Sequence, residues 1–119
     1  MPAEPSTRSS RVGAVTLLKP LANLVGGPET DELEALVGEA EREQSPAIVF
    51  DMSEVDFTNT VGLQVLVGAY LKLSRRGGKV CVSGLRPRVG HMFDVVRLHP
   101  LVPRFDTVEQ ALAACATEP

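Results

Sequence analysis

The stretch AIVFDMSEVDFTNTVGLQVLV, residues 47–67, joins two patterns that decide the fold. Its first five residues form a short, mostly apolar run, which is typical of a strand buried on both faces. From Thr60 to Arg76 apolar residues recur at helical spacing, and Asn59 is a residue type that caps helices well. The link at residues 52–59 therefore runs from the carboxyl end of a strand to the amino end of a helix, where ligands and modifications gather in open α/β sheets.

The same alternation of strand and helix flanks this unit. Strands are predicted over residues 12–18, 21–25, 79–83 and 101–105, and helices from about residue 30 to 44, from Pro87 and from Val108. Asp31 with Glu34 is expected to cap the first of these helices, and Thr107 with Gln110 the last. The pattern predicts an α/β fold with a mostly parallel or mixed sheet of four to five strands and about four helices packed on it.

Composition places the chain among globular domains. Its 119 residues suit one domain, and 44% of them are apolar and 23% charged. Residues 1–11, rich in Ser, Pro and Arg, are predicted to be a flexible tail before a domain over residues 12–115. A net charge of −3 argues against nucleic-acid binding. No apolar run approaches the roughly 18 residues of a membrane span, and the first residues do not resemble a secretory signal.

Few residues suggest catalysis or metal binding. His91 and His99 lack ligand spacing, so no metal site is expected. Two cysteines make no disulfide framework, which favours a reducing cytoplasm, and Cys81 in mid-strand is expected to be a small buried apolar residue. The carboxylates of residues 51, 54 and 56 could bind a cation or support a small enzyme, but a capping or solvated role fits their spacing better. No nucleotide-binding or nucleophile motif occurs, so no cofactor and no enzyme activity are expected.

Thr60 is the candidate modification site. A phosphate there would meet free backbone N–H groups and the positive end of the helix dipole. It would add about −1.5 to −2 charges to a nearly neutral patch, so a partner that docks without phosphate would lose its fit. The alternative is that Asn59 and Thr60 only cap the helix.

The helix after Thr60 is apolar around a wide arc. One stripe, which suits packing on the sheet, consists of Val65, Leu66, Ala69 and Leu73. A second stripe, well off the first, consists of Leu63, Val67 and Leu71. Either other helices cover the second stripe or it is an exposed patch for a partner.

Residues 48–63, IVFDMSEVDFTNTVGL, resemble the core of STAS domains, the family of the bacterial anti-sigma-factor antagonists. In those proteins a strand ends in Asp-Leu-Ser, and Asp-Ser-Ser-Gly-Leu opens the next helix. Residues 75–80, RRGGKV, look like the family's Arg-x-Gly-Gly before a strand, and residues 105–112, FDTVEQAL, like its closing strand and helix. The resemblance extends over roughly residues 12–114 with order and spacing kept.

The resemblance implies a partner switch. Thr60 matches the serine that a kinase phosphorylates, and Asn59 and Val61 match its neighbours. The unphosphorylated protein is expected to bind an anti-sigma factor that is a serine/threonine kinase, and a phosphatase would reset the switch. The implied partner surface is Asp56, Asn59, Thr60, Val61, Gly62, Leu63 and Val67. The protein is expected to be a cytoplasmic monomer or weak homodimer, without direct membrane insertion.

Several positions depart from the family pattern. Asn59 replaces an aspartate and Thr60 a serine, while Arg97 stands at a usual glycine and Pro20-Leu21 at an early Gly-x-Leu. Two other roles therefore stay open within the same fold. One is a scaffold subunit of a stress-signalling assembly, and the other is an accessory subunit of a lipid or anion transport complex.

Overall fold

Five strands form one mixed sheet in the computed structural model, which describes residues 5–98 and 101–116. They are β1 (Thr7–Val12), β2 (Val15–Pro20), β3 (Ala47–Asp51), β4 (Lys79–Ser83) and β5 (Arg104–Phe105). Their spatial order equals their order in the chain. β1 is antiparallel to β2, and all other neighbours are parallel, each joined by a helical crossover. The predicted α/β class is confirmed.

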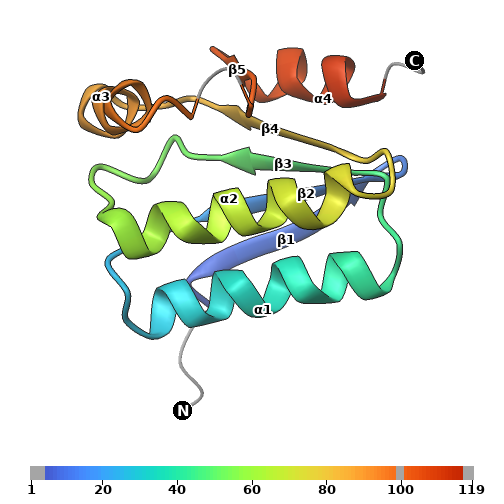
Figure 1. Ribbon diagram of the computed structural model, residues 1–119, viewed down its shortest axis with the longest axis horizontal. Helices are drawn as coiled ribbons and strands as arrows, with labels where there is room; N and C mark the ends of the chain where they lie inside the picture. The colour runs from blue at the N-terminus through green and yellow to red at the C-terminus, as the bar shows by residue number, and fades with distance from the viewer. Residues whose placement is uncertain (1–4, 99–100, 117–119) are drawn as a thin grey trace.

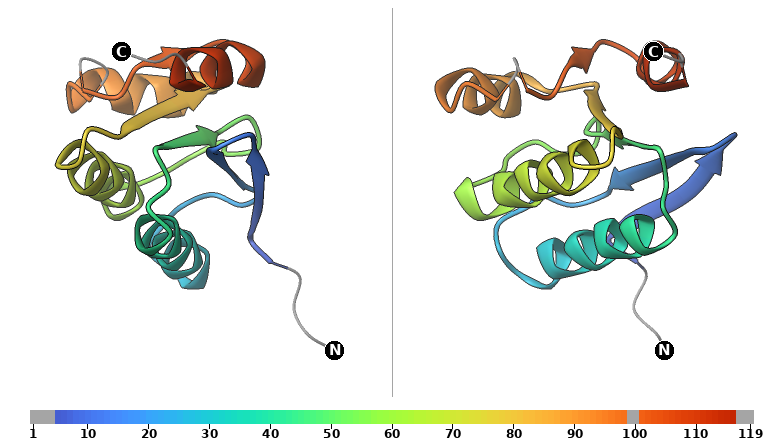
Figure 2. Two further views of the ribbon diagram at one scale, coloured as in Figure 1. Left: turned by 90° about the vertical axis from the view of Figure 1, so that its right-hand side faces the viewer. Right: turned by 45° about the vertical axis from the view of Figure 1, so that its right-hand side comes forward.

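Four helices cover the two faces of this sheet within the described residues. They are α1 (Pro28–Arg42), α2 (Thr60–Ser74), α3 (Pro87–Val95) and α4 (Val108–Ala116). Figures 1 and 2 show α1 and α2 side by side on one face, with α4 beyond β4 on the other. Alternate residues of β3 enter the two cores: Ile48 and Phe50 on the first face, Ala47 and Val49 on the second. Burial on both faces explains the continuous apolar run of β3.

The predicted tail over residues 1–11 is wrong for residues 7–11, because they belong to β1. This strand pairs with β2 from Thr7↔Pro20 to Val12↔Val15, across a turn where Gly13 adopts a φ of +62°. Only Thr7 of β1 is buried, so an edge strand formed from TRSSRV carries no apolar alternation for a sequence pattern to detect. Residues 1–4 of the predicted tail lie outside the described residues.

The connection from β2 to α1 also differs from its prediction. No strand forms over residues 21–25; a single bridge joins Leu24 to Thr58. Helix α1 begins at Pro28, three residues before the predicted cap Asp31, and its N-cap Gly27 has no side chain to accept a helix N–H. Proline suits the first position of a helix, and Thr30 Oγ1 accepts the Gly26 N–H at 2.9 Å. Side chains of the first turn thus hold the two glycines that precede the helix, because Glu29 also accepts the Gly27 N–H.

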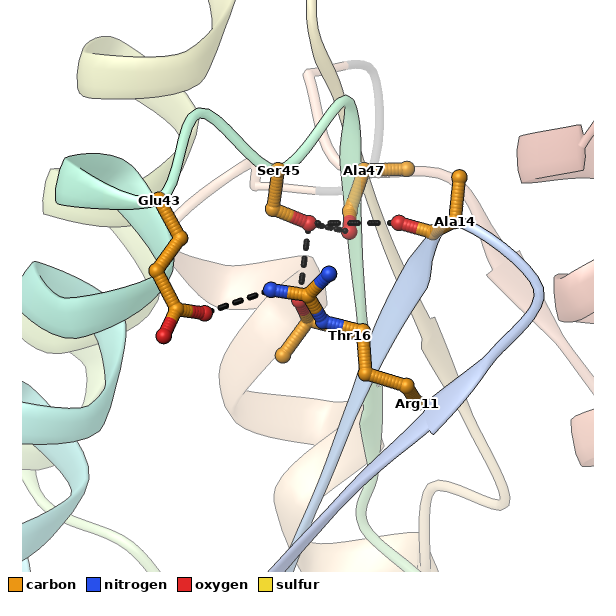
Figure 3. Close-up of polar contacts among 6 residues, drawn as sticks. All are labelled: Arg11, Ala14, Thr16, Glu43, Ser45 and Ala47. Atoms are coloured by element: carbon orange, nitrogen blue, oxygen red, sulfur yellow. Dashed lines mark hydrogen bonds and ion pairs between the residues drawn. The ribbon is translucent and has the colours of Figure 1, made fainter.

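At the amino end of β3 a buried polar cluster joins the hairpin to the α1–β3 connection (Figure 3). Thr16 Oγ1 and Ser45 Oγ lie 2.7 Å apart, and Ser45 Oγ donates to the Ala47 carbonyl oxygen at 3.0 Å. Because the Ser45 hydrogen is used there, the Thr16 hydroxyl is the donor to Ser45. Arg11 and Glu43 form an ion pair at the rim. We call Thr16, Ser45 and Ala47 the Ser45 junction.

Candidate functional site

The loop over residues 52–59 lies at the opposite, carboxyl end of β3 and leads into α2. In Figure 1 it lies at the left edge of the molecule, between α3 and the connection that leads from β2 to α1. Segments from three distant parts of the sequence therefore meet around the start of α2. We call residues 56–62 together with residues 23–26 the helix-entry site.

Backbone and side chain of residues 23–24 hold the loop in place. Asn23 Oδ1 accepts the N–H groups of Asp56 at 2.9 Å and Phe57 at 3.1 Å. The Leu24 carbonyl oxygen accepts both the Thr58 hydroxyl at 2.9 Å and the Asn59 N–H at 3.1 Å. Asn23 was not among the residues predicted for the site, because these bonds cross more than thirty positions of sequence.

Asn59 caps α2, as predicted, and its side-chain amide both accepts and donates a hydrogen bond. Its Oδ1 accepts the Gly62 N–H at 3.1 Å, while its Nδ2 donates to the Val25 carbonyl oxygen at 3.0 Å. An aspartate would serve the first bond and not the second, because a carboxylate has no hydrogen to donate. Asparagine at position 59 therefore ties the helix start to residue 25.

Gly62 is buried where two segments touch. A Cβ on this residue would lie 2.3 Å from Thr58 Oγ1 and 2.5 Å from the Leu24 carbonyl oxygen. A Cβ atom does not make nonbonded contacts this short, so any side chain would push α2 away from residue 24. Gly62 thus has a structural role under the site's surface.

Thr60 is the first residue of α2 and is exposed. Beside it, Val61 is 49% exposed and Val25 is 47% exposed. The side chain of Val61 lies over Gly26, because its Cγ1 would be 3.4 Å from a Cβ there. An exposed hydroxyl therefore borders a small apolar patch made by two segments.

Two members of the predicted partner surface are buried or partly buried rather than exposed. Leu63 is only 3% exposed and belongs to the main core, so the expectation that it contacts a partner is wrong. Val67 is half-buried and packs against the same core, whereas Leu71 is 48% exposed. The second apolar stripe of α2 is therefore covered at its start and open at its end.

On the side toward α3, arginines hold the loop. Arg86 Nε donates to the Ser53 carbonyl oxygen at 2.8 Å. The Arg88 guanidinium lies 4.9 Å from the centre of the Phe57 ring and 3.8 Å from the Asp56 carboxylate. The exposed Asp56 thus lies at the rim of the site, where it forms an ion pair with Arg88.

The remaining carboxylates show no catalytic or metal-binding arrangement within the described residues. Asp51 is buried, and its Oδ1 accepts the Ser53 N–H at 3.0 Å, a local turn contact. Among residues 5–98 and 101–116, no group of three or more His, Cys, Asp or Glu side chains could hold a metal ion. His91 is exposed, and His99 lies outside the described residues.

Glu29 supports the site from α1. Its Oε1 accepts the N–H groups of Val25 at 3.0 Å and Gly27 at 3.2 Å. The bond from Val25 is the largest cause that lowers the pKa of the Glu29 carboxyl from its ordinary value. The charged form of Glu29 therefore stabilises the segment that carries the exposed Val25.

Comparison with known proteins gives a consistent result. A family model described as STAS domain matches residues 27–111. An anti-sigma F factor antagonist of Paenibacillus polymyxa is 29% identical over 72 residues, which are 60% of this chain and 62% of that protein. The aligned part thus spans about three-fifths of the length of this curated relative.

Two solved structures are similar over nearly the whole chain. An anti-sigma factor antagonist from Mycobacterium paratuberculosis has a TM-score of 0.80 at 26% identity, covering 93% of each chain. A putative anti-sigma factor antagonist from Thermotoga maritima has a TM-score of 0.86 at 19% identity, covering 93% of this chain and 95% of that one. In the part of the chain that the structure describes, no helix is long and apolar enough to cross a membrane.

Proposed function

The chain belongs to the STAS domain family, and we propose that within it the protein acts as an anti-sigma-factor antagonist whose partner binding is switched off by phosphorylation of Thr60. The observation that carries this proposal is the exposed Thr60 hydroxyl at the first position of a capped helix, beside an exposed apolar patch. This is also the position that the family resemblance assigns to the phosphorylated residue.

The start of α2 favours an added phosphate. Its first turn contains no acidic residue, so a phosphate would meet no like charge within that turn. The helix dipole and the unpaired N–H groups of a first turn stabilise an anion by about 0.3–1 kcal/mol. Modification of Thr60 would therefore leave α2 folded and change only what its entrance presents.

What the phosphate changes is the partner surface. We propose that the partner covers Asn59, Thr60, Val61 and Val25, with Asp56 at the rim and Val67 at the margin. A phosphate in the middle of this surface would have to lose its water without a matching cation. Leaving a charge unpaired in an interface costs on the order of 2–5 kcal/mol, enough to abolish a regulatory complex.

The proposed partner is an anti-sigma factor that is itself a serine/threonine kinase, because one protein can then both cover Thr60 and modify its hydroxyl. A phosphatase would restore the binding form. Such a cycle takes place in the cytoplasm, and it requires neither a cofactor nor catalysis by this chain. A monomer or weak homodimer would leave the helix-entry site free for the partner.

Titration calorimetry with a purified anti-sigma-factor kinase from the same cells tests this proposal. Thr60→Val, which removes the hydroxyl and keeps the shape, is expected to bind like the parent protein. Thr60→Glu is expected to bind more than roughly ten-fold more weakly, since it places a charge in the interface. Ser10→Glu adds the same charge on the exposed strand β1 and serves as the control. Equal affinity of Thr60→Glu and the parent would show that Thr60 is no switch.

A further inference from the structure

Two cysteines from distant parts of the chain touch in the second core. Cys81 lies in the middle of β4 and Cys115 in the last turn of α4, and they are 34 positions apart. Their sulfur atoms lie 2.9 Å apart, and both residues are buried, at 4% and 8% exposure. The proposed partner switch uses neither residue.

We propose that Cys81 and Cys115 are a peroxide-sensitive thiol pair that closes to an intramolecular disulfide and fixes α4 on β4. A disulfide needs a sulfur–sulfur distance of about 2.05 Å, so the two atoms must approach by less than about 1 Å. Because both thiols already face each other inside one packed layer, this approach requires no rearrangement of the fold. Burial also prevents either thiol from meeting a thiol of another molecule.

A cavity of about 350 Å³ gives an oxidant access to one member of the pair. It is lined by Tyr70, Gly78, Lys79, Cys81, Leu101 and Phe105, among others. Hydrogen peroxide is scarcely larger than water and fits such a space. Peroxide in this cavity would therefore lie next to Cys81, even though the residue presents little surface to bulk solvent.

The hydrogen bond between the thiols distinguishes their roles. Cys115 Sγ–H donates to Cys81 Sγ, which lowers the pKa of Cys81, and the charge of Lys79 lowers it further. The same contact raises the pKa of Cys115, which stays a thiol. Since the thiolate is the nucleophile toward peroxide, Cys81 reacts first and Cys115 second.

The chemistry balances with peroxide as the oxidant. The Cys81 thiolate attacks one peroxide oxygen, the O–O bond breaks, and with one proton the products are a Cys81 sulfenic acid and water. The Cys115 sulfur then attacks the Cys81 sulfur, the S–O bond breaks, and a second water leaves with the Cys115 proton. In total the two thiols lose two electrons, and one peroxide is reduced to two waters.

Closing this bond constrains the unfolded chain, because it links residues 34 positions apart. Loop-closure entropy predicts that the oxidised protein melts roughly 5–15 °C above the reduced protein. Because burial keeps other thiols away, thiol reductants would reopen the pair only when α4 opens from β4. The domain would thus be more resistant to unfolding during oxidative stress.

The test is to treat the full-length, reduced protein with hydrogen peroxide, denature it, alkylate free thiols and measure the intact mass. The expected result is a loss of two hydrogen atoms with no alkylation, a Cys81–Cys115 cross-linked peptide, and recovery of two alkylation sites after dithiothreitol. Cys115→Ser is expected to accumulate sulfenic acid on Cys81, trapped by dimedone, whereas Cys81→Ser leaves Cys115 as a thiol. Circular dichroism checks that each variant is folded.

Three results would overturn the proposal. One is that native protein keeps two alkylatable thiols after peroxide treatment. Another is a disulfide between molecules, seen as a dimer on a non-reducing gel. The third is sulfenic acid forming on Cys115 of Cys81→Ser as fast as on Cys81 of Cys115→Ser. The first two measurements use the parent protein alone, so they decide the matter even if a variant does not fold.

Discussion

At the amino end of β3, Thr16 and Ser45 bury their hydroxyl groups against each other, whereas at the carboxyl end Thr60 keeps its hydroxyl exposed. Both ends connect β3 to a neighbouring helix, and both use polar side chains to satisfy backbone groups. At the Ser45 junction the polar groups have partners in the interior. At the helix-entry site Asn23, Asn59 and Glu29 satisfy the backbone, and the side chains of Thr60 and Val61 stay exposed.

The comparison teaches that rigidity and exposure coexist at the helix-entry site. Its backbone is tied by hydrogen bonds and by the close approach at Gly62, so the exposed side chains are held in fixed positions. A partner that docks there need not order a loop, which lowers the entropic cost of binding. A disruption of either end should lower stability, but only the carboxyl end should affect binding.

The largest loss of stability is expected for Gly62→Ala. The new Cβ would collide with Thr58 Oγ1 and the Leu24 carbonyl oxygen, so the substitution should lower the free energy of unfolding by about 3 kcal/mol. Gly68→Ala on the same helix is the control, because nothing lies within 4 Å of its Cβ. Higher helix propensity should make that control more stable by up to about 1 kcal/mol. Urea unfolding measures both, and equal stability of the two variants would contradict this account of Gly62.

Ser45→Ala removes the buried hydroxyl contact at the amino end of β3. It leaves the Thr16 hydroxyl buried without its acceptor and should cost about 2 kcal/mol. Adding Thr16→Val removes the stranded hydroxyl, so the double variant should lose less than the sum of the two single losses. Partner affinity should not change in either variant. Strictly additive losses in urea unfolding would show that the two hydroxyls are not coupled.

A smaller loss of stability is expected at Asn59, where two substitutions separate the contributions of its two hydrogen bonds. Asn59→Asp keeps the cap on the Gly62 N–H and loses the donor to the Val25 carbonyl oxygen, which should cost about 1 kcal/mol. Asn59→Ala removes both bonds and should cost about twice as much. Thermal unfolding of the three proteins gives this order. If Asn59→Asp is as stable as the parent, the bond to Val25 contributes nothing.

The smallest effect concerns Glu29 and depends on pH. Its lowered pKa means that its stabilisation is present above the ordinary value of 4.5 and is lost as the pH falls through the lower value of the folded state. Glu29→Gln should therefore show a shallower loss of unfolding free energy below about pH 5 than the parent. Glu34→Gln, at an exposed position of the same helix, is the control. If the parent and Glu29→Gln lose the same unfolding free energy as the pH falls, this result would contradict the role of the carboxylate.

The β3–α2 unit was predictable because its signals are local. An apolar run bounded by Asp51 and a capping asparagine before an apolar helical pattern identify the strand, the helix and the exposed start of that helix. Because Asn59 was predicted to cap the helix, Thr60 was predicted to be at the helix entrance. The capping pair Thr107 and Gln110 was likewise predictable, and both of its bonds form.

What the sequence did not predict depends on distant contacts or on missing apolar pattern. Strand β1 lies at an edge and needs no buried side chain beyond Thr7, so its sequence looks like a tail. The burial of Leu63 depends on how α2 packs in the main core, and the contact between Cys81 and Cys115 depends on where α4 lies. Neither contact leaves a signal in sequence spacing.

The most direct test of the proposed switch is to map phosphorylation on the protein recovered from its own cells, during growth and under stress. The proposal predicts a phosphate on Thr60 whose occupancy changes with the condition, with fragment ions excluding the neighbouring Thr58, which is fully buried. Thr60 found unmodified in every condition would contradict the switch and would favour constitutive binding by a scaffold or transport subunit.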